Sequence, residues 1–380
     1  MRIAGLFAGI GGFEHGLHQA GHETVLLCEI KPEAQAVLRE KFPGIRIDPD
    51  VRGLGPIPKG TEVICAGFPC QDLSQAGRTN GLAGEQSGLI HAVFEALRTR
   101  RIRPLLVIEN VPFMLQLHGG AAMRTIIEEV EALGYRWAYR VVDSFSFGLP
   151  QRRERVFMVA SHGDLRPGDV LLVDDRPLSR PETAVGRLAH GFYWTEGKEG
   201  LGWAVDAVPT VKNGSTIGIA SPPAILMPNL EIVTPSIQDA EAMQGFDPGW
   251  TEAAETVERP SARWSLVGSA VSVPVARWLG EKLARPGEVS AGDVGPFPAE
   301  GKLPRAAYGG ANGRFAVAIS TDPVGKRGPH LATFIERPAK PLSAKATNGF
   351  YSRATHPDTR LRFADGFIES VKRHLDTMVS

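Results

Sequence analysis

The chain has 380 residues, more than one typical hydrophobic core accommodates, so we expect two or three structural units. Its 42 basic residues balance 42 acidic ones, which excludes a protein that coats nucleic acid through overall charge and requires any such contact to come from a local patch. Its three cysteines, Cys28, Cys65 and Cys70, form no CxxC pair, which excludes a disulfide framework and a cysteine zinc site.

The N-terminal residues lack the pattern of a secretion signal, because the chain becomes rich in glycine directly after Phe7. No apolar stretch approaches the roughly 20 residues that a membrane span requires. The cysteine usage fits a reducing compartment. We therefore expect a soluble cytoplasmic protein that does not bind a membrane.

Residues 1 to about 160 alternate short apolar runs with segments of helical periodicity. This order is typical of an α/β fold with a Rossmann-like parallel sheet and helices on both of its faces. The predicted strands are 3–7, 24–28, 63–66, 105–108, 139–143 and 155–160, and the predicted helices between them are 32–41, 88–99 and 123–133.

The rest of the chain is less regular. Residues 161–261 are expected to form a smaller, loop-rich domain, with helical periodicity resuming at 235–244. A helix over 271–283 follows, and we expect the segment 262–284 to complete the first domain. Residues 285–380 are rich in glycine and proline, carry a mild basic excess and end in a predicted helix over 362–378, so they are expected as an extension whose role the sequence does not define.

Cys70 lies in a turn that follows the predicted strand 63–66. Open α/β sheets place their chemistry at the carboxyl ends of strands, and a cysteine near a helix N-terminus or a basic group can act as a nucleophile. A lone cysteine is more often a small buried apolar residue, and Cys65 fits that description. Pro69 and the polar pair Gln71 and Asp72 favour the nucleophile for Cys70.

The predicted strand 3–7 runs into the glycine-rich turn Gly9–Gly12 and then into a helix. Such glycines let backbone amides approach a ligand at the helix N-terminus. A dinucleotide fingerprint would place its third glycine at position 14, which is Glu14, so a pyrophosphate ligand is disfavoured. Glu29 ends the second strand and can accept both ribose hydroxyls, and Asp50 suits an exocyclic amine. Together these residues indicate an adenosyl ligand.

With these motifs in place, the chain resembles the DNA cytosine-5 methyltransferases of bacterial restriction-modification systems. The resemblance covers roughly residues 1–284. It rests on the order of eight motifs, since each is weak alone. The motifs are Phe7–Phe13, Glu29, Asp50–Val51, Gly67–Ser74, Glu109–Val111, Gln151–Phe157, Gln244–Phe246 and Val267–Val271.

The chemistry of the catalytic candidates agrees with this resemblance. Carbon 5 of cytosine is a poor nucleophile, and addition of the Cys70 thiolate to carbon 6 would make it an enamine carbon. Glu109 is the predicted acid and hydrogen-bond partner at ring nitrogen 3. The family match places Arg155 at oxygen 2, with Arg153 as its neighbour. Alone, Glu109 could cap a helix and the arginines could lie on a solvated edge, but their convergence on neighbouring strand ends favours catalysis.

The resemblance implies S-adenosylmethionine as the methyl donor and S-adenosylhomocysteine as the product. It places Phe7 against the adenine, Gly9–Gly12 near the methionine part, Glu29 on the ribose and Val51 beside the adenine. The other predicted cofactor-binding residues are Ala8, Ile10, Ile30, Asp50, Phe68, Pro69, Leu89, Ser269 and Val271. The family usually has Asn where Ser269 stands, and serine keeps a hydrogen-bonding group with a shorter reach.

The expected partner is duplex DNA, in which the target base has to be rotated out of the helix. The family places sequence recognition in its variable region, here about residues 161–235. The predicted DNA-binding residues are Gln71, Ser74, Lys212, Asn213 and Ser215, although an ordinary polar turn explains the last three nearly as well. We expect a monomer without a metal, associated with the bacterial nucleoid. The sequence leaves open whether a cognate restriction endonuclease is a partner.

Three alternatives remain at this point. An RNA cytosine-5 methyltransferase that acts on tRNA would share the fold, but the long variable region and the tail favour DNA. A nicotinamide-dependent oxidoreductase is disfavoured by Glu14 and by the set of Cys70, Glu109 and Arg155. A DNA-binding module without catalysis is disfavoured by the intact nucleophile and acid.

Overall fold

The computed structural model describes residues 1–68, 87–98, 103–214, 220–290, 292 and 294–379, and these residues form two compact units. The first unit comprises Met1–Asp143, Glu154–Pro177 and Val271–Gly325, and the second comprises Ser144–Arg153, Leu178–Ala270 and Lys326–Ser380. The segment after residue 285, expected as an extension of undefined role, contributes to both units. Among the described residues, no helix has the length and apolar character needed to cross a bilayer.

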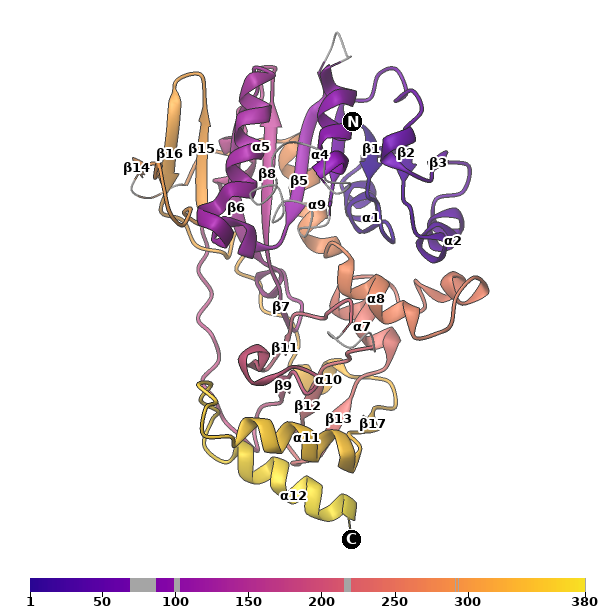
Figure 1. Ribbon diagram of the computed structural model, residues 1–380, viewed down its shortest axis with the longest axis vertical. Helices are drawn as coiled ribbons and strands as arrows, with labels where there is room; N and C mark the ends of the chain where they lie inside the picture. Colours follow the sequence, from indigo (N-terminus) through magenta and orange to yellow (C-terminus); the bar gives the residue numbers. More distant parts are fainter. Residues whose placement is uncertain (69–86, 99–102, 215–219, 291, 293, 380) are drawn as a thin grey trace. The chain divides into compact units, whose positions relative to one another are not determined.

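The first unit is built on a sheet to which the described residues contribute ten strands, in the order β14-β16-β15-β6-β8-β5-β4-β1-β2-β3 (Figure 1). All six predicted strands are present in it. The strands are β1 (Arg2–Leu6), β2 (Glu23–Cys28), β3 (Ile47–Asp48), β4 (Val63–Ala66), β5 (Leu105–Asn110), β6 (Arg136–Asp143), β8 (Glu154–Ser161), β14 (Val294–Pro296), β15 (Ala306–Gly310) and β16 (Gly313–Val317).

The sheet is mixed, whereas the sequence pattern predicted a parallel one. Strands β1 to β5 pair in parallel, but β8 runs antiparallel between β5 and β6. Residues 144–153, which connect β6 to β8, are too few for the crossover that a parallel pair needs. The tail then adds β15, β16 and β14 as antiparallel strands beside β6.

Helices cover both faces of this sheet, as expected (Figure 1). On one face, Ala4, Leu6 and Ile64 pack with apolar residues of α4 and α5, and α1 lies on the opposite face with α9. The helices of the unit are α1 (Gly12–Gln19), α2 (Pro32–Lys41), α4 (Ser87–Arg98), α5 (Ala121–Ala132), α6 (Gly168–Leu171) and α9 (Val273–Ala284). The four helices of this unit whose bounds were predicted, at 32–41, 88–99, 123–133 and 271–283, form within two residues of those bounds.

The backbones of α1 and of the segment that leads into α9 touch directly. A Cβ on Gly12 would lie 2.3 Å from the carbonyl oxygen of Val271, and one on Gly16 would lie 2.5 Å from that of Val273. Real Cβ atoms do not approach backbone oxygens so closely, so only glycine fits at these two positions. This contact places Val271 against the first turn of α1.

The second unit is organised around an antiparallel sheet in the order β10-β9-β12-β13-β17. Its strands are β9 (His190–Phe192), β10 (Trp203–Val205), β12 (Ala224–Leu226), β13 (Ile232–Thr234) and β17 (Lys340–Pro341), and β7 (Gln151–Arg152) pairs separately with β11 (Val208–Pro209). The helices are α7 (Ile237–Met243), α8 (Ala262–Ser269), α10 (Leu331–Phe334), α11 (Ala344–Ala354) and α12 (Phe367–Val379).

The last two helices build the core of this second unit. Phe350 of α11 and Phe367 and Val371 of α12 are fully buried against Phe192 and Leu226 of the sheet. The C-terminal helix begins at Phe367, five residues later than predicted, because Gly366 adopts a left-handed φ of 79° that interrupts the helix.

The tail also supplies a charge to a buried acid. Asp239, in the first turn of α7, is fully buried and caps the helix together with Ser236. Its Oδ1 accepts a hydrogen bond at 2.9 Å from Nη1 of Arg337, whose side chain is 31% exposed. A buried carboxylate is stable only when it is paired, so the tail is a structural part of this unit.

We predict that Arg337→Met lowers the free energy of unfolding by roughly 1–3 kcal/mol, because it leaves Asp239 buried with one partner fewer. Urea denaturation measures the change. Lys340→Met, on the exposed strand β17, is the matched control. Adding Asp239→Asn to Arg337→Met should cost less than the sum of the single changes, and strict additivity would contradict the pairing.

Candidate functional site

The predicted cofactor loop lies at the carboxyl end of β1, where Phe7 has a positive φ of 58°. Such a conformation is strained for a bulky residue and is retained when the surroundings fix it. The amide of Ala8 donates to the carbonyl of Cys28 at 3.0 Å, and Gly11 stands at the N-cap of α1. The loop is thus held in place between the ends of two strands.

Glu29 lies directly beside this loop. Its Oε2 accepts a hydrogen bond from the amide of Gly9 at 2.8 Å, and its Oε1 accepts one from the amide of Lys31 at 2.9 Å. Each carboxylate oxygen has more than one acceptor site, so both can still receive a hydroxyl. The geometry therefore fits the predicted ribose contact.

Apolar side chains gather around the same strand ends. Ile30 is 59% exposed directly after Glu29, and Val51 is buried. The rings of Phe7 and Phe68 meet edge to face, with 6.4 Å between their centroids. A flat aromatic ligand would find partners of this kind.

Asp50 is already engaged by a neighbour. Its carboxylate accepts hydrogen bonds from Nε and Nη2 of Arg52, at 3.0 and 2.6 Å, and these bonds hold its pKa below the ordinary value. An amine ligand would share this carboxylate with Arg52. Of the remaining candidates on this unit, Ile10 is buried, Ala8 and Leu89 are half-buried, and Val271 contacts Gly12.

The predicted acid and arginine are in contact. Nε of Arg155, on β8, lies 3.0 Å from Oε1 of Glu109, on β5, and both side chains are largely buried. Next to Glu109, the Asn110 side chain donates to the carbonyl of Phe68 at 3.0 Å. Asn110 was not predicted as a functional residue, and its polarity within a buried strand end was the available signal. It fixes the chain at Phe68, which lies two residues after the end of β4 and two residues before Cys70.

Arg153, predicted as a catalytic neighbour, lies in the second unit and is 1% exposed. Its guanidinium donates to the carbonyls of Val211, Gly268 and Ala270 at 2.8–3.2 Å. The structure thus gives it a structural role, and a catalytic role stays a prediction.

Two further buried side chains of the motifs also bind backbone groups. Gln151 donates to the carbonyl of Met243 and accepts from the amide of Val211, and Gln244 donates to the carbonyl of Val267. From the sequence, these glutamines were recognised as parts of motifs but were given no role of their own. Their burial shows that they join the motifs within the second unit.

Several predicted residues lie outside the described part of the chain: Pro69, Cys70, Gln71, Ser74 and Ser215. Of the other predicted DNA-binding residues, Asn213 is exposed. Lys212 forms an ion pair with Glu196 at 3.0 Å, and its ammonium lies 3.9 Å from the centre of the Tyr193 ring. Ser269 is exposed at the end of α8. The roles predicted for these residues stay predictions.

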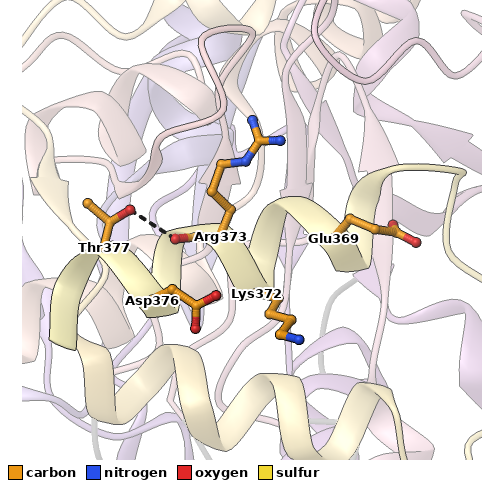
Figure 2. A pocket seen from close by; sticks show the side chains of 5 residues that line it. All are labelled: Glu369, Lys372, Arg373, Asp376 and Thr377. Atoms are coloured by element: carbon orange, nitrogen blue, oxygen red, sulfur yellow. Dashed lines mark hydrogen bonds between the residues drawn. The ribbon is translucent and has the colours of Figure 1, made fainter. Parts of the chain in front are cut away.

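A shallow hollow on α12 offers no comparable chemistry (Figure 2). Its lining is two acids, two bases and a threonine of one helix, all exposed: Glu369, Lys372, Arg373, Asp376 and Thr377. The charges balance and the side chains point in different directions (Figure 2). Within the described ranges, no group of three or more His, Cys, Asp or Glu side chains is placed to hold a metal ion.

Comparison with known proteins identifies a matching family and several relatives. The family model of the C-5 cytosine-specific DNA methylases matches residues 1–188. The Type II methyltransferase M2.BsuMI of Bacillus subtilis (strain 168) is 43% identical over 392 residues, which cover 99% of this chain and 98% of that protein. The similarity to M2.BsuMI therefore includes the tail.

Other relatives match a shorter part. The Type II methyltransferase M.MspI of Moraxella sp is 31% identical over 156 residues, covering 41% of this chain and 37% of its own. Among solved structures, the Entamoeba histolytica methyltransferase EhMeth has a TM-score of 0.54 at 13% identity, covering 74% of this chain and 97% of its own. The S. pombe Dnmt2 methyltransferase has a TM-score of 0.54 at 16% identity, covering 74% and 98%. At these identities the two structures show a shared fold.

We predict that Arg153→Met lowers the free energy of unfolding by roughly 2–4 kcal/mol, because three buried carbonyls lose their donor. Arg152→Met is the control, since Arg152 is half-buried and contacts the Phe145 ring. Equal stability of the two variants in urea denaturation would show that the Arg153 contacts are not structural.

Proposed function

Because the chain belongs to the C-5 cytosine-specific DNA methylase family and is a DNA cytosine methyltransferase of the Type II kind, we propose how it performs this reaction. It transfers a methyl group from S-adenosylmethionine to carbon 5 of a cytosine rotated out of a specific duplex sequence. The reaction passes through a covalent adduct with Cys70. The observation that carries this proposal is the contact between Glu109 and Arg155.

Cys70 supplies the nucleophile. Its thiolate adds to carbon 6 of the ring, and the electron pair of the 5,6 double bond makes carbon 5 nucleophilic. After methylation, loss of the proton on carbon 5 returns the electrons to the ring and expels the thiolate. Cys28 and Cys65 are buried, and burial as the largest cause raises the pKa of both thiols, so neither suits this role.

Glu109 and Arg155 stabilise the adduct. Glu109 hydrogen-bonds to ring nitrogen 3, where negative charge develops, and Arg155 donates to oxygen 2. Their contact at 3.0 Å orients both side chains before the base enters, so less reorganisation is needed at the moment of reaction. The hydrogen bond of Asn110 to Phe68 holds the chain that follows β4 beside Glu109.

The cofactor site has the groups that an adenosyl ligand requires. Glu29 would hold the ribose, Ile30, Val51 and Phe7 would flank the adenine, and the loop Gly9–Gly12 would face the methionine part. The open space around Gly9, where a Cβ would meet nothing within 4 Å, supports this use. S-adenosylmethionine, when bound, supplies an electrophilic methyl group.

The deciding experiment offers the protein labelled S-adenosylmethionine with duplex DNA or with tRNA. Label in DNA supports the proposal, and label in tRNA alone would establish an RNA cytosine methyltransferase instead. Bisulfite sequencing of DNA from cells that express the chain then identifies the modified sequence.

We predict that Cys70→Ala abolishes methyl transfer, whereas Cys65→Ala retains it. Duplex DNA with 5-fluorocytosine at the target should also form a covalent complex that survives denaturing electrophoresis, because fluorine cannot leave carbon 5 as a proton does. The complex should be absent from Cys70→Ala. Turnover by Cys70→Ala would refute the adduct.

We predict that Glu109→Gln lowers the single-turnover methylation rate by about 10²–10⁴-fold, because the amide cannot donate a proton at nitrogen 3 as an acid does. Glu95→Gln, an exposed carboxylate of α4, is the control. Binding of DNA should change far less than the rate, and an unchanged rate would remove Glu109 from the mechanism.

A further inference from the structure

One buried carboxyl group of the first unit takes no part in the chemistry described above. Glu14 is the third residue of α1, and its side chain is 1% exposed. Its Oε2 has no hydrogen-bond partner among the described residues. A buried polar atom without a partner costs free energy, so its presence calls for an explanation.

The Glu14 carboxyl lies on the sheet, in the space that a side chain at Gly5 would fill. A Cβ on Gly5 would be 1.8 Å from Oε1 of Glu14 and 3.3 Å from Cδ2 of Leu27. Gly5 pairs with Leu27 on β2 and with Cys65 on β4. The carboxyl therefore lies beside an apolar methyl group of Leu27 and the buried thiol of Cys65. Gly5, which it covers, is two residues before Phe7 of the cofactor loop.

The described charged and titratable groups near Glu14 lie on the sheet, on α9 and on α1 itself. Cys65 on β4 and Glu29 at the end of β2 interact with it electrostatically. On α9, which packs against α1, Arg277 is paired with Glu281 and Lys282 with Asp174. On α1 itself, His15 contacts Gln19 and His18 accepts a bond from Thr24.

These surroundings favour the neutral acid. Burial is the largest cause that raises the pKa of Glu14, to about 7, and the negative charge of Glu29 adds to it. The hydrogen bond between Glu14 and its own backbone acts in the opposite direction. Glu14 thus changes charge near neutral pH.

We propose that Glu14 is a specificity-determining residue that distinguishes the methyl donor from the demethylated product by charge. The inference rests on the proposed use of S-adenosylmethionine, whose sulfonium is positive, whereas the sulfur of the product is a neutral thioether. Glu14 stands in the first turn of the helix whose N-terminal glycines face the methionine part in that proposal. An ionised Glu14 attracts the sulfonium and has no such interaction with the thioether.

The sign of the pH dependence follows. Below about pH 7, Glu14 is protonated, and the donor gains the attraction only if the proton is released to solvent. Above that pH, the carboxylate is already ionised and the donor binds with its full advantage. Because the ionised fraction of a carboxyl with a pKa of about 7 rises about tenfold between pH 6 and 8, we expect the preference for donor over product to rise by up to about tenfold over this range.

Isothermal titration calorimetry of the full chain with S-adenosylmethionine and with S-adenosylhomocysteine, from pH 6 to 8, tests this. Both ligands share their amino acid part, so the ratio of their Kd values largely removes its titration. Glu14→Gln keeps the shape and removes the charge, and it reports any pH dependence that the ligands themselves contribute. Glu33→Gln, in the first turn of α2, is the matched control and should behave like the unchanged protein.

The Kd of the product divided by the Kd of the donor should rise with pH in the unchanged protein and in Glu33→Gln. It should rise clearly less in Glu14→Gln. An equal rise in all three proteins overturns the inference. If Glu14→Gln does not fold, titrations of the unchanged protein in two buffers of different ionisation enthalpy give the number of protons released when each ligand binds. Release of a proton on binding donor but not product supports the inference, and equal counts overturn it. If neither ligand binds at any pH, the proposed cofactor is wrong instead.

Discussion

The first unit depends on the close approach between α1 and the chain that enters α9. Gly12 and Gly16 let the backbone at Val271 and Val273 lie directly on α1. Any larger residue at either glycine would push the two segments apart, and the loop Gly9–Gly12 would lose its contact with the backbone of Val271. A contact between residues about 260 positions apart thus shapes the end of β1, and Glu29 and Phe7 then complete the site around it.

Buried arginines hold the later parts of the chain in a similar way. Arg140 is fully buried on β6 and donates to the carbonyls of Leu171, Val173 and Ser320, so residue 320 of the tail is tied to the sheet. Burial, the largest effect, lowers the pKa of Arg140 to about 10. In the second unit, the buried Arg153 plays the same part, and the partly exposed Arg337 pairs with the carboxylate of Asp239 instead. Guanidinium groups suit this task because their donors are fixed in a plane and can serve several acceptors at once.

The sequence predicted the part of the fold that is local. Apolar runs such as 63–66 and the amphipathic pattern of 32–41 identified strands and helices with correct bounds, and the order of the motifs predicted that Glu109 and Arg155 meet. The antiparallel direction of β8 could have been inferred from the short connection 144–153. The pairing of β15 with β6 could not, because neither strand carries a signal for its partner. For the same reason the sequence around Arg337 did not indicate its contact with Asp239, and the tail was predicted only as an extension of undefined role.

Two carboxyl groups near the strand ends show how surroundings assign different roles to the same side chain. Glu109 lies beside Arg155, which carries a permanent positive charge, and their contact fixes the orientation of both side chains before the base enters. Glu14 lies among Gly5, Leu27 and Cys65, where the cost of burying a negative charge outweighs the stabilisation that its own backbone hydrogen bond provides. Its charge therefore depends on pH and on what binds nearby. A fixed pair suits a transition state that is the same in every turnover. A variable charge suits the one step in which the ligand itself changes charge, the conversion of a sulfonium into a thioether.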